Sequence, residues 1–117
     1  MQTLFESELK VMEILWEHQP VTAKQVSVIA AETVGWNKNT TYTMLKKLEA
    51  KGLLTREDPG FVCTATVSRD EVQKEEARSL VGRLFGGSRQ ALFSALLSDE
   101  TLSAEEYEEL RRLIETR

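Results

Sequence analysis

Apolar positions recur at helical spacing along the first half of the chain and predict three helices in succession. The first covers residues 7–18, with acidic residues on its solvent face and an apolar stripe formed by Leu9, Met12, Leu15 and Trp16. Thr22 is placed to cap a second helix, which reaches about residue 34. Gly35-Trp36-Asn37 then leaves only a short turn before a third helix at 38–51, so the pattern predicts a helix-turn-helix.

The third helix has an unusual outer face. Its inward positions are Thr41, Leu45 and Leu48, and Gly52 supplies a left-handed cap after Lys51. A solvated helix face is normally built from Glu and Lys pairs, whereas this one holds hydroxyls, an amide, a phenol and lysines. The outer residues are Lys38, Asn39, Thr40, Tyr42, Thr43, Lys46 and Lys47. Hydroxyls and amides reach base edges and phosphates, and lysines neutralise phosphate charge, so we interpret this as the recognition helix of a DNA-binding domain. A threonine-rich surface helix that merely packs is the alternative.

The periodicity changes to about two after Gly52 and predicts a two-stranded hairpin. Its strands cover 53–57 and 61–67, and Asp58-Pro59-Gly60 is a strong turn sequence. Three helices followed by a hairpin make a winged helix. Arg56 is placed for a phosphate contact, although acidic neighbours make this wing less cationic than such a role prefers. Cys63 is expected to be a small buried hydrophobe.

The second half of the chain predicts three more helices, which begin at capping residues Ser68, Ser88 and Ser103 and are interrupted by Gly86-Gly87. They carry more large apolar side chains than three short helices can bury among themselves, and exposed apolar surface marks an interface. We therefore predict a winged-helix domain at 1–67 and a helical dimerisation region at 68–117, with the interface between residues 72 and 114. The interface candidates are Leu80, Leu84, Phe85, Leu92, Phe93, Leu96, Leu97, Tyr107, Leu110, Leu113 and Ile114. Folding of these helices back onto the winged helix, as one monomeric domain, is the alternative.

The net charge of −4 disfavours a nucleic-acid partner at first sight, because affinity for DNA rests on cationic contacts to phosphate. The charge is unevenly distributed, however. Residues 36–57 hold five basic side chains against two acidic ones, and this positive segment coincides with the predicted recognition helix. The patch is small, which suggests that one copy binds weakly and that two copies are needed for useful affinity.

Composition and the absence of certain motifs limit the classes of protein to which the chain can belong. An apolar content of 41% and a charged content of 29% are typical of a soluble globular protein, and no apolar run approaches the ~20 residues that span a bilayer. The N-terminal segment lacks the pattern of a secretion signal and Cys63 is the only cysteine, so we expect a cytoplasmic protein with no membrane partner. The chain has no glycine-rich phosphate loop, no nucleophile with a nearby base and no metal-ligand spacing. We therefore expect neither an enzyme nor a bound cofactor or metal.

With both halves in view, the chain resembles the penicillinase-repressor family, which includes the methicillin-resistance and copper-transport repressors. The matching segments run in the same order: Glu8 to Trp16, Trp36 to Leu54, Arg69 to Glu71, Phe85 to Ser88, and Leu102 to Glu106. The resemblance implies a mainly α fold with a small β-hairpin, and a homodimeric repressor bound to an inverted-repeat DNA operator. By position, the DNA-reading helix of the family falls on residues 38–51.

Two departures leave the inducing signal open. In the β-lactam-responsive branch of the family, a sensor protease system inactivates the repressor at an Asn-Phe bond, and the matching pair here is Ala95-Leu96. The copper branch has a cysteine-rich C-terminal metal site, whereas this chain ends Leu-Ile-Glu-Thr-Arg. We expect the inducer to be a sensor protease that acts at another point, a small ligand or another partner. A winged helix used only for protein interaction is the alternative function.

Overall fold

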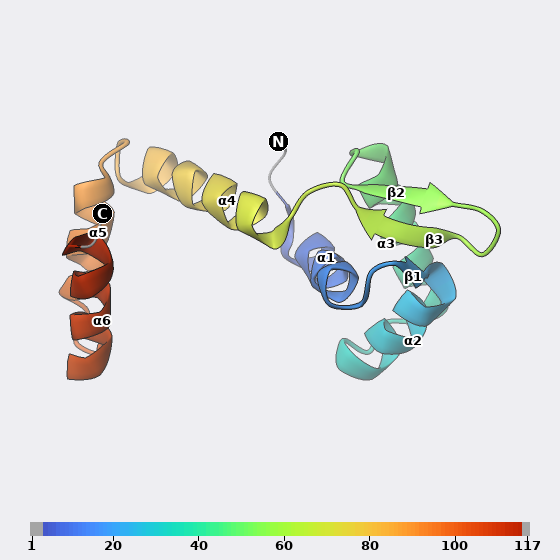
Figure 1. Ribbon diagram of the computed structural model, residues 1–117, viewed down its shortest axis with the longest axis horizontal. Helices are drawn as coiled ribbons and strands as arrows, with labels where there is room; N and C mark the ends of the chain where they lie inside the picture. The colour runs from blue at the N-terminus through green and yellow to red at the C-terminus, as the bar shows by residue number, and fades with distance from the viewer. Residues whose placement is uncertain (1–3, 116–117) are drawn as a thin grey trace. The chain divides into compact units, whose positions relative to one another are not determined.

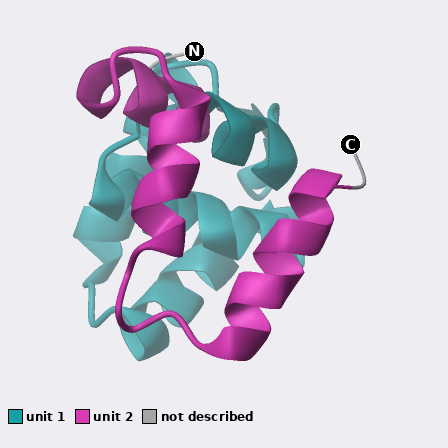
Figure 2. Cartoon of the chain, turned by 90° about the vertical axis from the view of Figure 1, so that its left-hand side faces the viewer, with its two compact units in different colours: residues 1–75 teal, residues 76–117 magenta. Residues whose placement is uncertain are grey.

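The computed structural model describes residues 4–115, so the ends of both predicted regions, 1–3 and 116–117, lie outside the described residues. The elements in chain order are α1 (Glu6–His18), β1 (Val21–Thr22), α2 (Ala23–Thr33), α3 (Lys38–Ala50), β2 (Leu54–Glu57), β3 (Val62–Ala65), α4 (Arg69–Leu84), α5 (Arg89–Leu97) and α6 (Ala104–Glu115) (Figure 1). The mainly helical fold with a small β element is confirmed. The chain divides into two compact units, residues 1–75 and 76–117, coloured separately in Figure 2. In the described part of the chain, no helix combines the length and apolar character needed to cross a membrane.

The helix-turn-helix forms where the sequence predicts it, because local capping fixes each boundary. The Thr22 hydroxyl accepts from the Gln25 N–H at 3.1 Å, which starts α2. The Asn37 side chain accepts from the Thr40 N–H at 2.8 Å, which starts α3. Between them, Gly35 adopts φ +81°, a left-handed conformation that glycine reaches without steric cost. The turn therefore delivers α3 directly after α2.

The predicted hairpin is confirmed, and a third strand joins it. The sheet has the antiparallel order β1-β3-β2, with Val21 paired to Cys63 on one side of β3 and Arg56 to Cys63 on the other. The prediction of two strands missed the pairing of β1, because two residues are too few to show a period along the sequence. A two-stranded hairpin is marginal alone, and the extra strand together with the helices fixes it to the domain.

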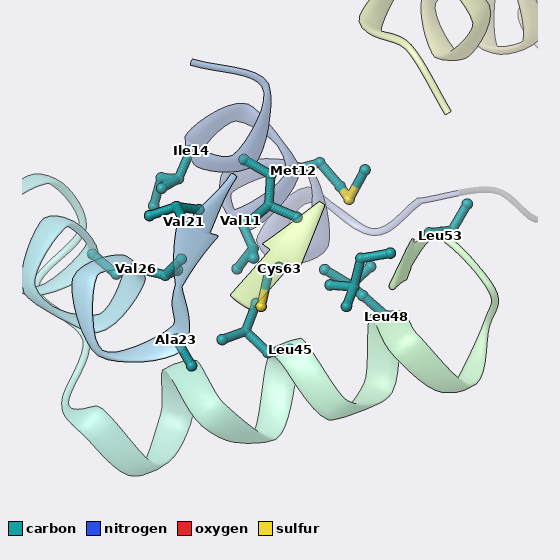
Figure 3. Packing of buried hydrophobic residues seen from close by; sticks show 13 residues of the cluster. Val11, Met12, Ile14, Val21, Ala23, Val26, Leu45, Leu48, Leu53 and Cys63 are labelled. Atoms are coloured by element: carbon teal, nitrogen blue, oxygen red, sulfur yellow. The ribbon is translucent and has the colours of Figure 1, made fainter. Parts of the chain in front are cut away.

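The core of the first unit lies between α1, α2, α3 and the sheet, as Figure 3 shows. Thr41, Leu45 and Leu48 are fully buried on the inner face of α3, which confirms the predicted orientation of that helix. Cys63 is also fully buried, as predicted for a small hydrophobe. Burial, and secondarily the nearby Glu49 carboxylate, raise the pKa of the Cys63 thiol to about 11, although Arg56 opposes this. The thiol is therefore protonated at neutral pH.

The inward face of α1 differs from the predicted stripe. Leu9 is 37% exposed, whereas Val11, Met12, Ile14 and Leu15 are buried. The predicted stripe is confirmed at Met12 and Leu15 and wrong at Leu9, because apolar residues occupy two overlapping faces and the sequence alone did not decide between them. Trp16 is only half-buried.

Trp16 ties the end of the hairpin and the start of α4 to α1. Its indole N–H donates to the Val67 carbonyl at 2.9 Å. The Arg69 guanidinium lies 5.4 Å from the centre of the Trp16 ring and pairs with Glu13 at 2.7 Å. The first turns of α4 are thereby held on the first unit, where Val72 is also buried.

Glu8 is the other exception on α1, since acidic residues were predicted on the solvent face. Its side chain is fully buried and pairs with Lys51 Nζ at 2.7 Å, just after the end of α3. The Phe5 N–H also donates to Glu8 at 2.9 Å. Burial would raise the pKa of Glu8, but the Lys51 bond, the Phe5 N–H and the charges of Lys51 and Lys47 together lower it below its usual value of 4.5.

We expect Glu8→Gln to destabilise the protein by about 2 kcal/mol at pH 7, because the buried partner of Lys51 is lost. The lowered pKa means that the unfolded chain binds a proton at a pH where folded Glu8 is still ionised. The stabilisation is therefore complete above pH 4.5 and is lost as the pH falls through the lower folded pKa. Urea unfolding at pH 7 and pH 3 measures this, with exposed Glu6→Gln as the control. A Glu8→Gln effect that is as large at pH 3 as at pH 7 would contradict it.

The second unit consists of the rest of α4 together with α5 and α6. The capping hydrogen bonds of Ser68, Ser88 and Ser103 are all present. Gly86 and Gly87 both have positive φ, and α4 ends just before them, as predicted. Neither α5 nor α6 has a buried residue. The large exposed apolar residues around these helices are Leu84, Phe93, Leu96, Tyr107, Leu113 and Ile114.

Candidate nucleic-acid interface

The recognition-helix candidates lie on the surface of α3, away from the core. Its opposite face is the buried row of Thr41, Leu45 and Leu48. The exposed candidates are Lys38, Asn39, Thr40, Thr43, Lys46 and Lys47. Tyr42 is half-buried, with the Lys38 Nζ 5.4 Å from its ring centre. One face of a rigid helix thus offers amide, hydroxyl, phenol and ammonium groups to a partner.

The three lysines near the end of α3, Lys46, Lys47 and Lys51, differ in their surroundings. The Nζ of Lys47 lies 5.7 Å from the centre of the Phe5 ring, and that of Lys51 lies 5.0 Å from the same ring. Cation–π contacts of this kind are weak at exposed sites, so Lys47 can leave Phe5 for a phosphate at small cost. Lys51 forms an ion pair with the buried Glu8. Lys46 makes no ion pair among the residues that the structure describes, which leaves its ammonium available.

Arg56 is the predicted cation of the wing, and its guanidinium already has partners in the free protein. Its Nε lies 3.7 Å from the Glu49 carboxylate of α3. Its guanidinium carbon lies 4.4 Å from the centre of the Phe61 ring. The side chain still keeps about a third of its exposure, so a phosphate can approach it. Glu49 therefore competes with any phosphate for Arg56.

Sequence reasoning did not identify Phe61 or Glu49 as part of this surface. The Phe61 ring lies 6.1 Å from the Tyr42 ring, with the planes at 41°. It therefore lies between Tyr42 of α3 and Arg56 of the wing. Phe61 directly follows the Asp58-Pro59-Gly60 turn, and a large aromatic residue at that place was the available clue. Glu49 gave no clue, because one acidic residue near a helix end is commonplace.

The interface candidates of the second unit are spread over α4, α5, α6 and the turn after α4. Leu80, Phe85, Leu92, Leu97 and Leu110 are half-buried. The remaining candidates are exposed, with Leu84 at 67% and Leu113 at 64%. A hollow of about 660 Å³ is lined by Arg89, Phe93, Leu110, Leu113 and Ile114. Val72, at the start of the predicted interface range, is instead buried in the first unit.

The described residues contain no group of three or more His, Cys, Asp and Glu side chains that could hold a metal ion. Glu13 forms an ion pair with Arg69, and Glu8 forms one with Lys51. The chemistry of the α3 surface is that of hydrogen bonding and cationic attraction.

The three helices, the tight turn and the three-stranded wing define the first unit as a winged helix-turn-helix, the fold of many DNA-binding domains. The solution structure of the DNA-binding domain of the repressor BlaI matches with a TM-score of 0.54 and 30% identity, covering 58% of this chain and 85% of that one. Residues 4–116 match the model of the penicillinase repressor family. The chain belongs to that family of transcriptional repressors.

Two relatives are similar to this chain over most of its length. An uncharacterized 16.5 kDa protein of Latilactobacillus sakei is 30% identical over 110 residues, which cover 92% of this chain and 75% of that protein. The penicillinase repressor of Staphylococcus aureus is 24% identical over 110 residues, which cover 92% of this chain and 87% of that protein. Both similarities extend well beyond the winged helix into the C-terminal helices.

Proposed function

We propose that the protein is a transcriptional repressor that binds an inverted-repeat operator as a homodimer, with residues 38–51 in the major groove. The observation that carries the proposal is the surface of α3, where Asn, Thr, Tyr and Lys side chains face outward from a fully buried inner row. Thr40, Tyr42 and Thr43 would lie against base edges or flanking phosphates, as Asn39 would, while Lys38, Lys46, Lys47 and Arg56 would contact phosphates.

The dimer is proposed from the second unit, with residues 68–117 as its dimerisation region. Without a buried residue of their own, α5 and α6 are covered only if another apolar surface packs on them. A second copy is the partner that a C2 dimer requires, since the same surface serves both subunits. Two recognition helices can then reach successive major grooves about 34–36 Å apart. A repressor of this kind acts in the cytoplasm.

The inducer is proposed to act without a metal on the C-terminal region. Ala95-Leu96 stands where the cleavable pair of the β-lactam-responsive branch is expected, and Cys63, the single cysteine of the chain, is buried in the first unit. A sensor protease that cuts elsewhere, a small ligand or a partner protein would release the repressor.

Glu49→Gln should strengthen DNA binding by about two- to fivefold at low salt. The substitution removes the carboxylate 3.7 Å from Arg56 and leaves the guanidinium free for phosphate. The slope of log affinity against log salt should steepen by up to about one per chain. Fluorescence anisotropy over a salt series measures both quantities. Glu57→Gln, which removes an exposed charge on the same wing, is the matched control. Equal gains in both variants would mean that only net charge matters.

A mobility-shift assay with a duplex from the protein's own promoter region distinguishes the repressor from the alternative, a winged helix that serves only protein interaction. The proposed function requires a salt-sensitive shift that a shuffled duplex of the same length does not compete away. A protein interaction module would give no sequence-dependent shift. The exposed lysines of α3 and the hydroxyls between them favour the repressor.

A further inference from the structure

Phe61 has a backbone conformation that is unusual for its side chain. Its φ is +53°, and among the described residues it is the one non-glycine residue with positive φ. A bulky residue in the left-handed region costs free energy, whereas the preceding Gly60, at φ +93°, takes a positive φ freely. Such a conformation persists where the surrounding structure offsets its cost, and contacts of Phe61 contribute to that.

Those contacts join three elements of the first unit. The Phe61 carbonyl accepts from the Ala23 N–H at 2.9 Å, which ties the wing turn to the start of α2. The ring lies 6.1 Å from the Tyr42 ring on α3 and 4.4 Å from the Arg56 guanidinium on β2. Lys38 lies on Tyr42 in turn, at 5.4 Å. A row of contacts thus runs from Lys38 through Tyr42 and Phe61 to Arg56, with a cation at each end and the two rings between them.

The contacts restrict the two side chains that the proposed function uses on either side of the ring. The Arg56 guanidinium lies against the Phe61 ring, which restricts the orientations of this planar group. Tyr42 is held between Phe61 and Lys38. The position of Arg56 relative to α3 is therefore already set when DNA binds. Arg56 and Tyr42 then lose little side-chain entropy on binding.

We infer that Phe61 is a positioning residue for operator recognition: its ring holds Arg56 of the wing and Tyr42 of the recognition helix in fixed positions relative to each other. This rests on the proposed function, because their relative position matters only if both side chains contact DNA. Phe61 itself need not touch the duplex. Its role is to convert two separately mobile contacts into one preorganised surface.

Phe61→Leu should lower affinity for operator about tenfold, while affinity for a shuffled duplex changes less than about twofold, because the charges remain and only their placement is lost. Phe61→Tyr keeps the ring and should bind like the wild type. The operator probe is the tightest duplex that the wild-type full chain selects from a random-sequence library. Thr64→Ala, on the exposed side of β3, is the matched control and should bind like the wild type.

A double-mutant cycle separates positioning from a general loss of structure. If Phe61 acts through Arg56, Phe61→Leu should cost much less operator affinity in an Arg56→Ala background than in the wild type. Arg56→Lys keeps the charge and loses the planar stacking, so it should lose operator affinity while keeping affinity for the shuffled duplex. Full operator affinity in Phe61→Leu, or an equal loss in both backgrounds, overturns the inference. A wild-type chain that selects no sequence from the library overturns the proposed function as well, whereas normal selection with an unaffected Phe61→Leu variant overturns the role of Phe61 alone.

Discussion

Replacing Lys46 and Lys47 together with alanine should weaken binding to duplex DNA of any sequence by about 100- to 1000-fold at 0.1 M salt. A dimer loses four phosphate contacts, and each contributes about 0.9 to the slope of log affinity against log salt, so the slope should fall by about 3 to 4. Lys46 should account for slightly more of the loss, because Lys47 gives up its weak contact with the Phe5 ring when it binds a phosphate. Anisotropy titrations with operator and shuffled duplexes over a salt series measure it.

The matched control for the lysines is the double substitution Lys10→Ala and Lys74→Ala. It removes the same charge from exposed positions on α1 and α4, neither of which belongs to α3 or the wing. The control should bind almost like the wild type, because distant exposed charges are screened at this salt. If both double variants lost affinity equally, net charge would explain the effect and α3 would not be the DNA-facing helix. An unchanged affinity and slope in the Lys46 and Lys47 variant would contradict the assignment directly.

Leu96→Asp should convert the protein to a monomer and lower operator affinity by about 100-fold or more. Leu96 is 42% exposed on α5, so the carboxylate is solvated in the single chain and the fold should survive. In a dimer the same carboxylate would be buried without a partner, at a cost of several kcal/mol unless it is protonated. The second half-site contact then ceases to be intramolecular, which removes the gain from linking two binding units. Sedimentation and DNA titration on the same samples measure both effects.

Leu9→Asp is the matched control for the interface, because it makes the same substitution at a similarly exposed leucine, 37% exposed on α1 and outside the proposed dimerisation region. It should remain dimeric and bind operator normally. A Leu96→Asp variant that stays dimeric would remove Leu96 from the interface. A monomeric variant with wild-type affinity would show that DNA binding does not depend on dimerisation through the C-terminal helices.

Much of the fold followed from the sequence because short-range rules determine it. Thr22, Asn37 and Ser88 each cap a helix by a hydrogen bond to an N–H three residues ahead, so composition near each boundary was enough. The inward row of α3 was predictable because Thr41, Leu45 and Leu48 allow only one apolar face. The hairpin turn at 58–60 was predictable from its residues alone.

The remaining features depend on contacts between distant parts of the chain. Glu8 is buried because Lys51, 43 positions later, meets it, and no local pattern on α1 contains that information. The pairing of β1 with β3 depends on the same kind of long-range approach. Glu49 and Phe61 gain their roles from Arg56 and Tyr42, which the fold brings together. The sequence thus identified Arg56 and Tyr42 as surface residues, but it did not show that Glu49 and Phe61 contact them.

The most direct test of the account is the stoichiometry of the full-length chain on an inverted-repeat duplex selected from a random library. Sedimentation velocity with a fluorescent duplex, across a protein titration and at two salt concentrations, gives the mass of each complex. The account predicts a single salt-sensitive transition to two chains per duplex, with no stable complex of one chain. Saturation at one chain per duplex, or the same weak binding to selected and shuffled DNA, would contradict a dimeric operator-binding repressor.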